Sequence, residues 1–148
     1  DKYVNGNKEA LNAQQIRGLE KFNANCASCH SGPAFNGGGS FQKFPTIPNG
    51  YFEAQYHISK DLGVAEVTKN DNDKHYFKVP TLRNIALTAP YFHNGSTYDL
   101  SKAVSVMGSS QLGVALSNEE TKKIVAFLKS LTGRLPEVTL PILPPRSR

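Results

Sequence analysis

The sequence predicts an all-α domain with long irregular loops. Two segments near the ends of the 148-residue chain carry apolar residues at helical spacing, and each follows a capping signal. Between Ser31 and Asn72, glycines and prolines are frequent and no hydrophobic period is sustained. At this length the chain should form a single domain, with a loop region that needs a packing surface from elsewhere.

The first helix is expected from about residue 12 to residue 25. Asn12 can cap it, and Gln15 three positions later completes a capping box. Its apolar stripe consists of Ile16, Leu19 and Phe22. Gly18 lies on the same flank as Phe22, so a second helix is expected to cross closely there.

Directly after this helix comes a C-x-x-C-H motif, Cys26, Cys29 and His30, which uses both cysteines of the chain. Two thiols at this spacing can add to the two vinyl groups of a haem, while the adjacent imidazole reaches the iron. A redox-active disulfide or half of a zinc site would be alternatives. The first occurs in a βαβ context and the second needs a further ligand pair, and the sequence shows neither. One covalently attached c-type haem is therefore predicted, and it would supply the packing surface for the loops.

Two further helices are expected in the second half. The longer one runs from about residue 118 to residue 131, with Ser117 and Glu120 as a capping box and Gly133 as the stop signal. Its buried face consists of Ile124, Val125, Phe127, Leu128 and Leu131. This helix should pack against the first one at Gly18.

The shorter helix is expected from about residue 100 to residue 107, capped by Asp99 or Ser101 and ended by Gly108. Its inward residues are Ala103, Val104 and Met107. A helical turn is expected at residues 82–87, after Pro80. The domain should cover residues 1–134, and the four prolines in residues 135–148 predict an extended tail.

The second axial ligand of the iron is predicted to be Met107, the sole methionine of the chain. A thioether ligand favours Fe(II) and raises the reduction potential, whereas an open iron permits peroxide or gas chemistry. The competitors are three histidines. His57 and His75 lie in polar, loop-like stretches typical of solvated side chains. His93 lies in an aromatic turn, where a hydrogen-bonding or gating role and a structural role both stay open.

The stretch FKVPTLRNIALTAPYFHNGSTYDLSKAVSVMG, residues 77–108, closely resembles the C-terminal haem domain of bacterial di-haem cytochrome c peroxidases. The resemblance extends from ALNAQQIRGLEKF before the haem motif to IVAFLKSLTGRLP near the end of the chain. It implies a class I cytochrome c-like haem domain. In that family this domain carries the high-potential, electron-receiving haem, with ligands that map onto His30 and Met107. A calcium ion lies between the family's two domains, and its carbonyl ligands map onto Thr88 and Pro90.

The chain departs from the family in having one C-x-x-C-H, so the low-potential haem domain that reduces hydrogen peroxide is missing from it. Either the chain is one half of a larger protein or it is a cytochrome built on the same domain. Its start, DKYVNGNKEAL, resembles the family's domain linker and favours the first alternative.

The net charge of +5 comes from scattered lysines and arginines, which disfavours nucleic acid and favours acidic redox partners. No stretch approaches the roughly 20 apolar residues of a membrane span, and no signal peptide precedes Asp1. Because C-x-x-C-H haem is attached on the outer side of the bacterial cytoplasmic membrane, a periplasmic location is expected.

The expected function is electron transfer from a small periplasmic donor, a cytochrome c or copper protein, to a peroxidatic haem. No residue of this chain is expected to be catalytic. Arg83 is a candidate partner for a haem propionate, since its guanidinium matches a carboxylate, although an ordinary surface role is equally compatible. The rival interpretation is an open-iron enzyme or sensor that itself binds peroxide or a gas. A purely structural haem subunit is a third.

Overall fold

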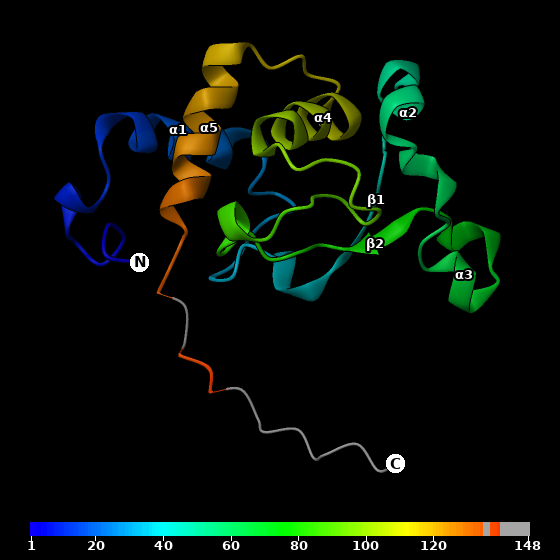
Figure 1. Cartoon of the computed structure of the whole chain (residues 1–148), viewed down its shortest axis with the longest axis horizontal. Helices are drawn as coiled ribbons and strands as arrows, with labels where there is room; N and C mark the ends of the chain where they lie inside the picture. The colour runs from blue at the N-terminus through cyan, green and yellow to red at the C-terminus, as the bar shows by residue number, and fades with distance from the viewer. Residues whose placement is uncertain (135–136, 140–148) are drawn as a thin grey trace, which may run out of the picture.

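The computed structural model describes residues 1–134 and 137–139, and these residues form a mostly helical domain with one small sheet (Figure 1). This confirms the predicted fold class. Of the tail predicted for residues 135–148, all but residues 137–139 lie outside the described part of the chain. None of the described helices has both the length and the apolar composition needed to cross a membrane.

The two terminal helices form as predicted. Helix α1 (Ala13–Asn25) begins with a capping box in which the Gln15 amide donates to Asn12 Oδ1 over 2.9 Å, while Asn12 N donates to Gln15 Oε1 over 2.9 Å. Helix α5 (Asn118–Ser130) begins in the same way, with Ser117 and Glu120 as the reciprocal pair. Each box satisfies two backbone donors that the helix itself leaves free, so both helix starts are fixed by local sequence.

Helices α1 and α5 cross in close contact at Gly18 (Figure 1). A Cβ atom added at Gly18 would collide with the backbone carbonyl of Lys123 and would lie 2.9 Å from Phe127 Cβ. The predicted packing of these two helices is therefore confirmed, and glycine is what permits it.

Replacing Gly18 with alanine should destabilise the fold by about 3 kcal/mol, because the obstacle is backbone that cannot rotate away. The matched control is Gly50→Ala. Gly50 is the first residue of helix α2 (Gly50–Tyr56), and a Cβ atom there meets nothing within 4 Å. The control should be neutral or slightly stabilising. Urea unfolding of the two haem-loaded variants measures the difference, and equal midpoints would contradict the close crossing.

Helix α4 (Leu100–Leu112) is longer than predicted. Asp99 caps its start as expected, accepting from the amides of Ser101 and Lys102. The expected stop at Gly108 is wrong, because the helix continues to Leu112 and the left-handed cap is Gly113, with φ +66°. Gly108 is instead a close-packing glycine, since a Cβ there would lie 2.9 Å from Leu116 Cδ1.

The region from Ser31 to Asn72 is more regular than its sequence pattern suggested. It contains α2, helix α3 (Ala65–Thr68) and strand β1 (Phe41–Lys43). Strand β1 pairs antiparallel with strand β2 (Tyr76–Lys78), and Phe41 lies opposite Lys78. The helical turn expected at residues 82–87 is a 3-10 turn at Ile85–Leu87. Other single 3-10 turns lie at Lys8–Ala10, Gly37–Gly39, Ile58–Lys60 and Asp71–Asp73.

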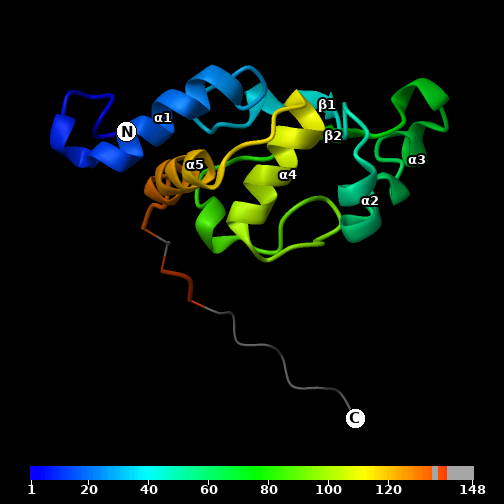
Figure 2. The same ribbon diagram turned by 90° about the horizontal axis from the view of Figure 1, so that it is seen from above.

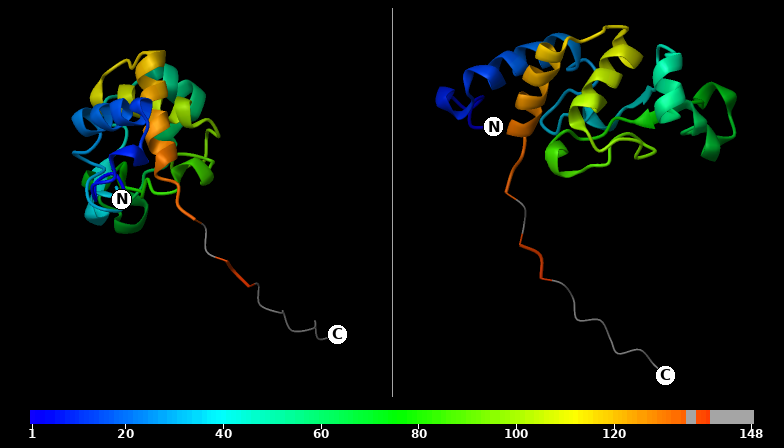
Figure 3. Two further views of the ribbon diagram at one scale, coloured as in Figure 1. Left: turned by 90° about the vertical axis from the view of Figure 1, so that its left-hand side faces the viewer. Right: turned by 45° about the horizontal axis from the view of Figure 1, so that its top comes forward.

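The core consists of two hydrophobic clusters. The α1–α5 pair lies at one end of the molecule, α2 and α3 lie at the other, and α4 lies between them (Figures 2 and 3). The first cluster comprises Phe22, Val104, Ile124, Val125, Phe127 and Leu128. The second comprises Phe44, Tyr56, Ile58 and Val106, with further aromatic rings packed against it. Helix α4 contributes a valine to each cluster and so joins the two halves of the core.

Candidate haem-binding site

The C-x-x-C-H residues lie on one helical turn that continues α1. Cys26 is the C-cap of the helix and donates its amide to Phe22 O over 2.7 Å. The amides of Cys29 and His30 both donate to Cys26 O, over 3.2 and 2.9 Å. Residues three and four apart on such a turn are neighbours. The structure therefore brings Cys26, Cys29 and His30 together, as a single attachment point requires.

Cys26 and Cys29 do not form a disulfide with each other. Burial raises the pKa of the Cys26 thiol to about 11, and the nearby Cys29 adds to this shift. Cys26 is therefore protonated at neutral pH. Within residues 1–134 and 137–139, no three histidine, cysteine or acidic side chains gather as a metal site. A tetrahedral zinc site needs four ligands, and the two cysteines of this turn do not supply them.

The His30 imidazole is half-buried and is oriented by backbone carbonyls. Its Nδ1 lies 3.2 Å from Phe35 O, so the tautomer protonated at Nδ1 donates there and leaves the Nε2 lone pair free. Burial lowers the pKa of His30, and the carbonyls of Phe35 and Pro80 partly oppose that shift. A neutral imidazole with a free Nε2 is the form that ligates iron, so the residues present fit a haem.

The loop after the motif packs tightly against it at Gly37, a residue that the sequence pattern did not single out. Gly37 has φ +60°, and a Cβ there would collide with the backbone oxygen of Cys29 and lie 2.8 Å from Ser40 Oγ. The only sequence feature that pointed to a special role for Gly37 was its place in a run of three consecutive glycines. Phe35, whose carbonyl meets His30, gave no such signal.

Arg83 is engaged by this chain's own groups. Its Nη2 and Nη1 atoms pair with the Asp1 carboxylate at 2.6 and 3.1 Å, and its Nε donates to Pro33 O over 2.7 Å. The guanidinium also lies 5.7 Å from the centre of the Phe35 ring. Arg83 therefore lies beside the loop that follows the haem motif, and the two terminal nitrogens of its guanidinium pair with Asp1.

Met107 lies within α4 rather than at its end, one turn after Ala103 and Val104. It is partly buried and packs against the second hydrophobic cluster, whereas Cys26 packs against the first. The helix-end position expected for Met107 is thus wrong, because α4 extends beyond it by more than a turn. Its place on the same helix face as the buried Ala103 and Val104 agrees with the predicted inward direction.

The competing histidines lie in different surroundings. His93 stacks on Phe77 with ring centres 4.1 Å apart, and its buried Nε2 has no hydrogen-bond partner among the described residues. Burial is the main cause of its lowered pKa. His57 is exposed at the C-cap of α2, and His75 Nδ1 lies 3.2 Å from Asp61 O. His93 is therefore the histidine that shares the aromatic surroundings of the second cluster.

The two candidate calcium residues lie on one exposed turn. Thr88 follows the 3-10 turn Ile85–Leu87, and its hydroxyl donates to Ile85 O over 3.3 Å. Thr88 and Pro90 are both exposed.

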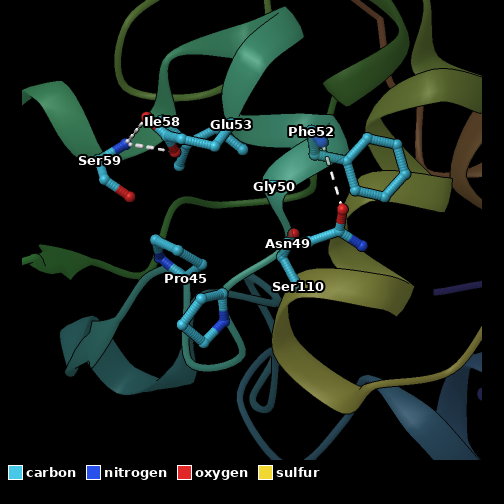
Figure 4. A pocket seen from close by; sticks show the side chains of 9 residues that line it. Pro45, Asn49, Gly50, Phe52, Glu53, Ile58, Ser59 and Ser110 are labelled. Atoms are coloured by element: carbon cyan, nitrogen blue, oxygen red, sulfur yellow. Dashed lines mark hydrogen bonds between the residues drawn. The ribbon is translucent and has the colours of Figure 1, made fainter.

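A separate cavity of about 170 Å³ lies between the start of α2 and Ser110 of α4 (Figure 4). Its polar groups are already used, because Asn49 caps α2 and Glu53 accepts from the Ser59 amide. Ligand sites usually measure about 300–1,000 Å³. This cavity is a gap in packing rather than a second site.

Comparison with known proteins agrees with this geometry. The Cytochrome c family model matches residues 15–132. The chain is 47% identical to the cytochrome c551 peroxidase of Nitrosomonas europaea, over 98% of this chain and 42% of that protein. It is 42% identical to the cytochrome c551 peroxidase of Pseudomonas aeruginosa, over 97% of this chain and 41% of that protein.

A similar fold occurs in a solved MauG-like protein associated with microbial copper homeostasis. The TM-score is 0.67 and the identity is 23%, over 84% of this chain and 48% of that one. The chain spans about two-fifths of the curated peroxidases that it resembles. The resemblance drawn from residues 77–108 is thereby confirmed.

Proposed function

The chain belongs to the cytochrome c family, whose members carry covalently bound haem c, and it is homologous to bacterial cytochrome c peroxidases; we propose that it is the electron-transferring haem domain of such a peroxidase. The observation that carries this is the helical turn of Cys26, Cys29 and His30, with His30 Nδ1 directed at the Phe35 carbonyl. Bound haem supplies one-electron chemistry between Fe(III) and Fe(II).

Four residues of the chain would hold the haem. Cys26 and Cys29 would form the thioethers, and His30 would ligate the iron. Met107 would be the second ligand, because it is the sole methionine and lies among apolar and aromatic side chains. Such apolar surroundings would keep water from a bound haem and support a high reduction potential.

Electrons enter from a small periplasmic donor and leave toward a second, peroxidatic haem domain. The relatives that support this are named peroxidases and are more than twice as long as this chain. The chain's net charge of +5 favours a donor with an acidic surface. The periplasm is the expected compartment, because c-type haem is attached outside the cytoplasm.

Carbon monoxide binding separates this proposal from an open-iron enzyme or sensor. The reduced, haem-loaded chain should keep its absorption spectrum under carbon monoxide, because a bound thioether blocks the sixth position. Rapid formation of a carbonyl complex would favour the rival.

Calcium should bind this chain weakly or not at all. Ca²⁺ prefers six to eight oxygen ligands, and the carbonyls of Thr88 and Pro90 supply too few. Calorimetric titration of the haem-loaded chain with calcium chloride should therefore show no binding tighter than micromolar. Submicromolar binding would contradict this and would indicate further ligands in this chain.

A further inference from the structure

A backbone carbonyl of the loop after the haem motif faces the His30 imidazole, since Phe35 O lies 3.2 Å from His30 Nδ1. A second segment, residues 81–83, begins 46 residues after Phe35 and is hydrogen-bonded to the same loop. The strength of the Nδ1–H hydrogen bond therefore depends on how these two segments are held together.

Thr81 and Arg83 tie the two segments. Thr81 Oγ1 donates to Ala34 O over 2.7 Å, and Arg83 Nε donates to Pro33 O over 2.7 Å. The amide of Arg83 also donates to Thr81 Oγ1 over 3.2 Å, so the two side chains act as one unit. These bonds reach the two residues directly before Phe35.

The backbone at Phe35 needs such support. Its φ is +52°, in the left-handed region that side-chain-bearing residues rarely occupy. A conformation of this kind persists where surrounding contacts hold it. The Phe35 ring supplies one contact by packing at the first hydrophobic cluster, and the bonds from Thr81 and Arg83 supply the backbone contacts.

We propose that Thr81 and Arg83 are positioning residues that hold the Phe35 carbonyl against His30 and thereby set the reduction potential of the haem. This rests on the proposed function, in which His30 ligates the iron. A firm Nδ1–H bond makes the imidazole a more basic ligand, which stabilises Fe(III). Loosening the loop weakens that bond and should raise the potential.

The test uses two charge-neutral changes in the haem-loaded chain, Thr81→Val and Arg83→Lys. The first removes the hydroxyl and the second keeps the charge but loses the Nε donor. Each should shift the ferric–ferrous equilibrium toward Fe(II) by about tenfold, or about 59 mV for a one-electron couple. Each should also speed hydrogen exchange at His30 Nδ1 several-fold, as read from its hyperfine-shifted proton resonance.

Matched controls are Thr46→Val and Arg17→Lys. Thr46 makes comparable hydrogen bonds with Lys43 and Gln111, and Arg17 donates within its own helix to Ala13. Neither touches the loop, so both controls should keep the potential of the unmodified chain. Urea unfolding verifies that all four variants are folded.

The outcomes distinguish the possible failures. If Thr81→Val and Arg83→Lys both leave the potential and the exchange rate unchanged, the positioning role is wrong. The alternative, that Arg83 acts only through its charge as a partner of a haem propionate, predicts an unchanged potential in both variants. If the unmodified chain shows no hyperfine-shifted imidazole resonance, His30 does not ligate the iron, and the proposed function itself fails.

Discussion

The Met107→Ala variant is expected to lose the weak far-red absorption band of a ferric iron–thioether bond. Its midpoint potential should fall by well over about 59 mV, the change that corresponds to a tenfold shift of the equilibrium constant for a one-electron couple. The reason is that a thioether stabilises Fe(II), so its removal favours Fe(III). Visible spectra and a spectroelectrochemical titration of the haem-loaded variant measure both effects.

Met107→Leu separates ligation from packing, because it keeps most of the side-chain volume within the second cluster and removes the sulfur. Both variants should lose the band, and the leucine variant should keep more of the stability. If neither variant changes the spectrum, Met107 is not the ligand. The next candidate would then be His93, whose buried Nε2 has no partner among the described residues.

Replacing Cys26 and Cys29 together with alanine should abolish covalent attachment. Acidified organic solvent should then extract all of the haem, whereas the unmodified chain should keep its haem through denaturation and extraction. The doubly substituted chain should also unfold at lower urea concentration, because a dissociable cofactor stabilises the fold only by mass action.

The control for this experiment is Ser28→Ala. Ser28 lies between the two cysteines and makes only a long hydroxyl contact of 3.9 Å to Cys29 Sγ. This variant should retain covalent haem. If haem washes out of the correctly matured, unmodified protein, the thioether assignment is wrong.

The sequence was sufficient to predict the parts of the fold that local chemistry determines. Helices α1 and α5 carry both a capping box and an apolar stripe, and both have the predicted N-cap residue, Asn12 and Ser117. The α4 boundary was missed because residue identity alone does not tell a capping glycine from a close-packing one. Gly108 is the close-packing glycine, because Leu116 lies directly against it, whereas Gly113 is the left-handed cap that ends the helix.

The remaining elements depend on contacts between distant segments. Strands β1 and β2 have three residues each, too few to show an alternating pattern, and they form because they pair with each other. The same reason applies at the candidate site. The C-x-x-C-H turn and the Phe35 carbonyl that faces His30 are close in sequence, but the hydrogen bond from Thr81 to Ala34 O in the same loop depends on the fold.

Steady-state peroxide consumption tests the central claim, that this chain transfers electrons and does not itself reduce hydrogen peroxide. The purified, haem-loaded chain would be mixed with peroxide and a reduced small cytochrome, and donor oxidation would be followed by absorbance. We expect rapid electron exchange with the donor and negligible peroxide turnover, because the proposed ligand Met107 would occupy the iron position that peroxide needs. A turnover near the roughly 10 per second typical of enzymes would contradict the account and establish the open-iron alternative.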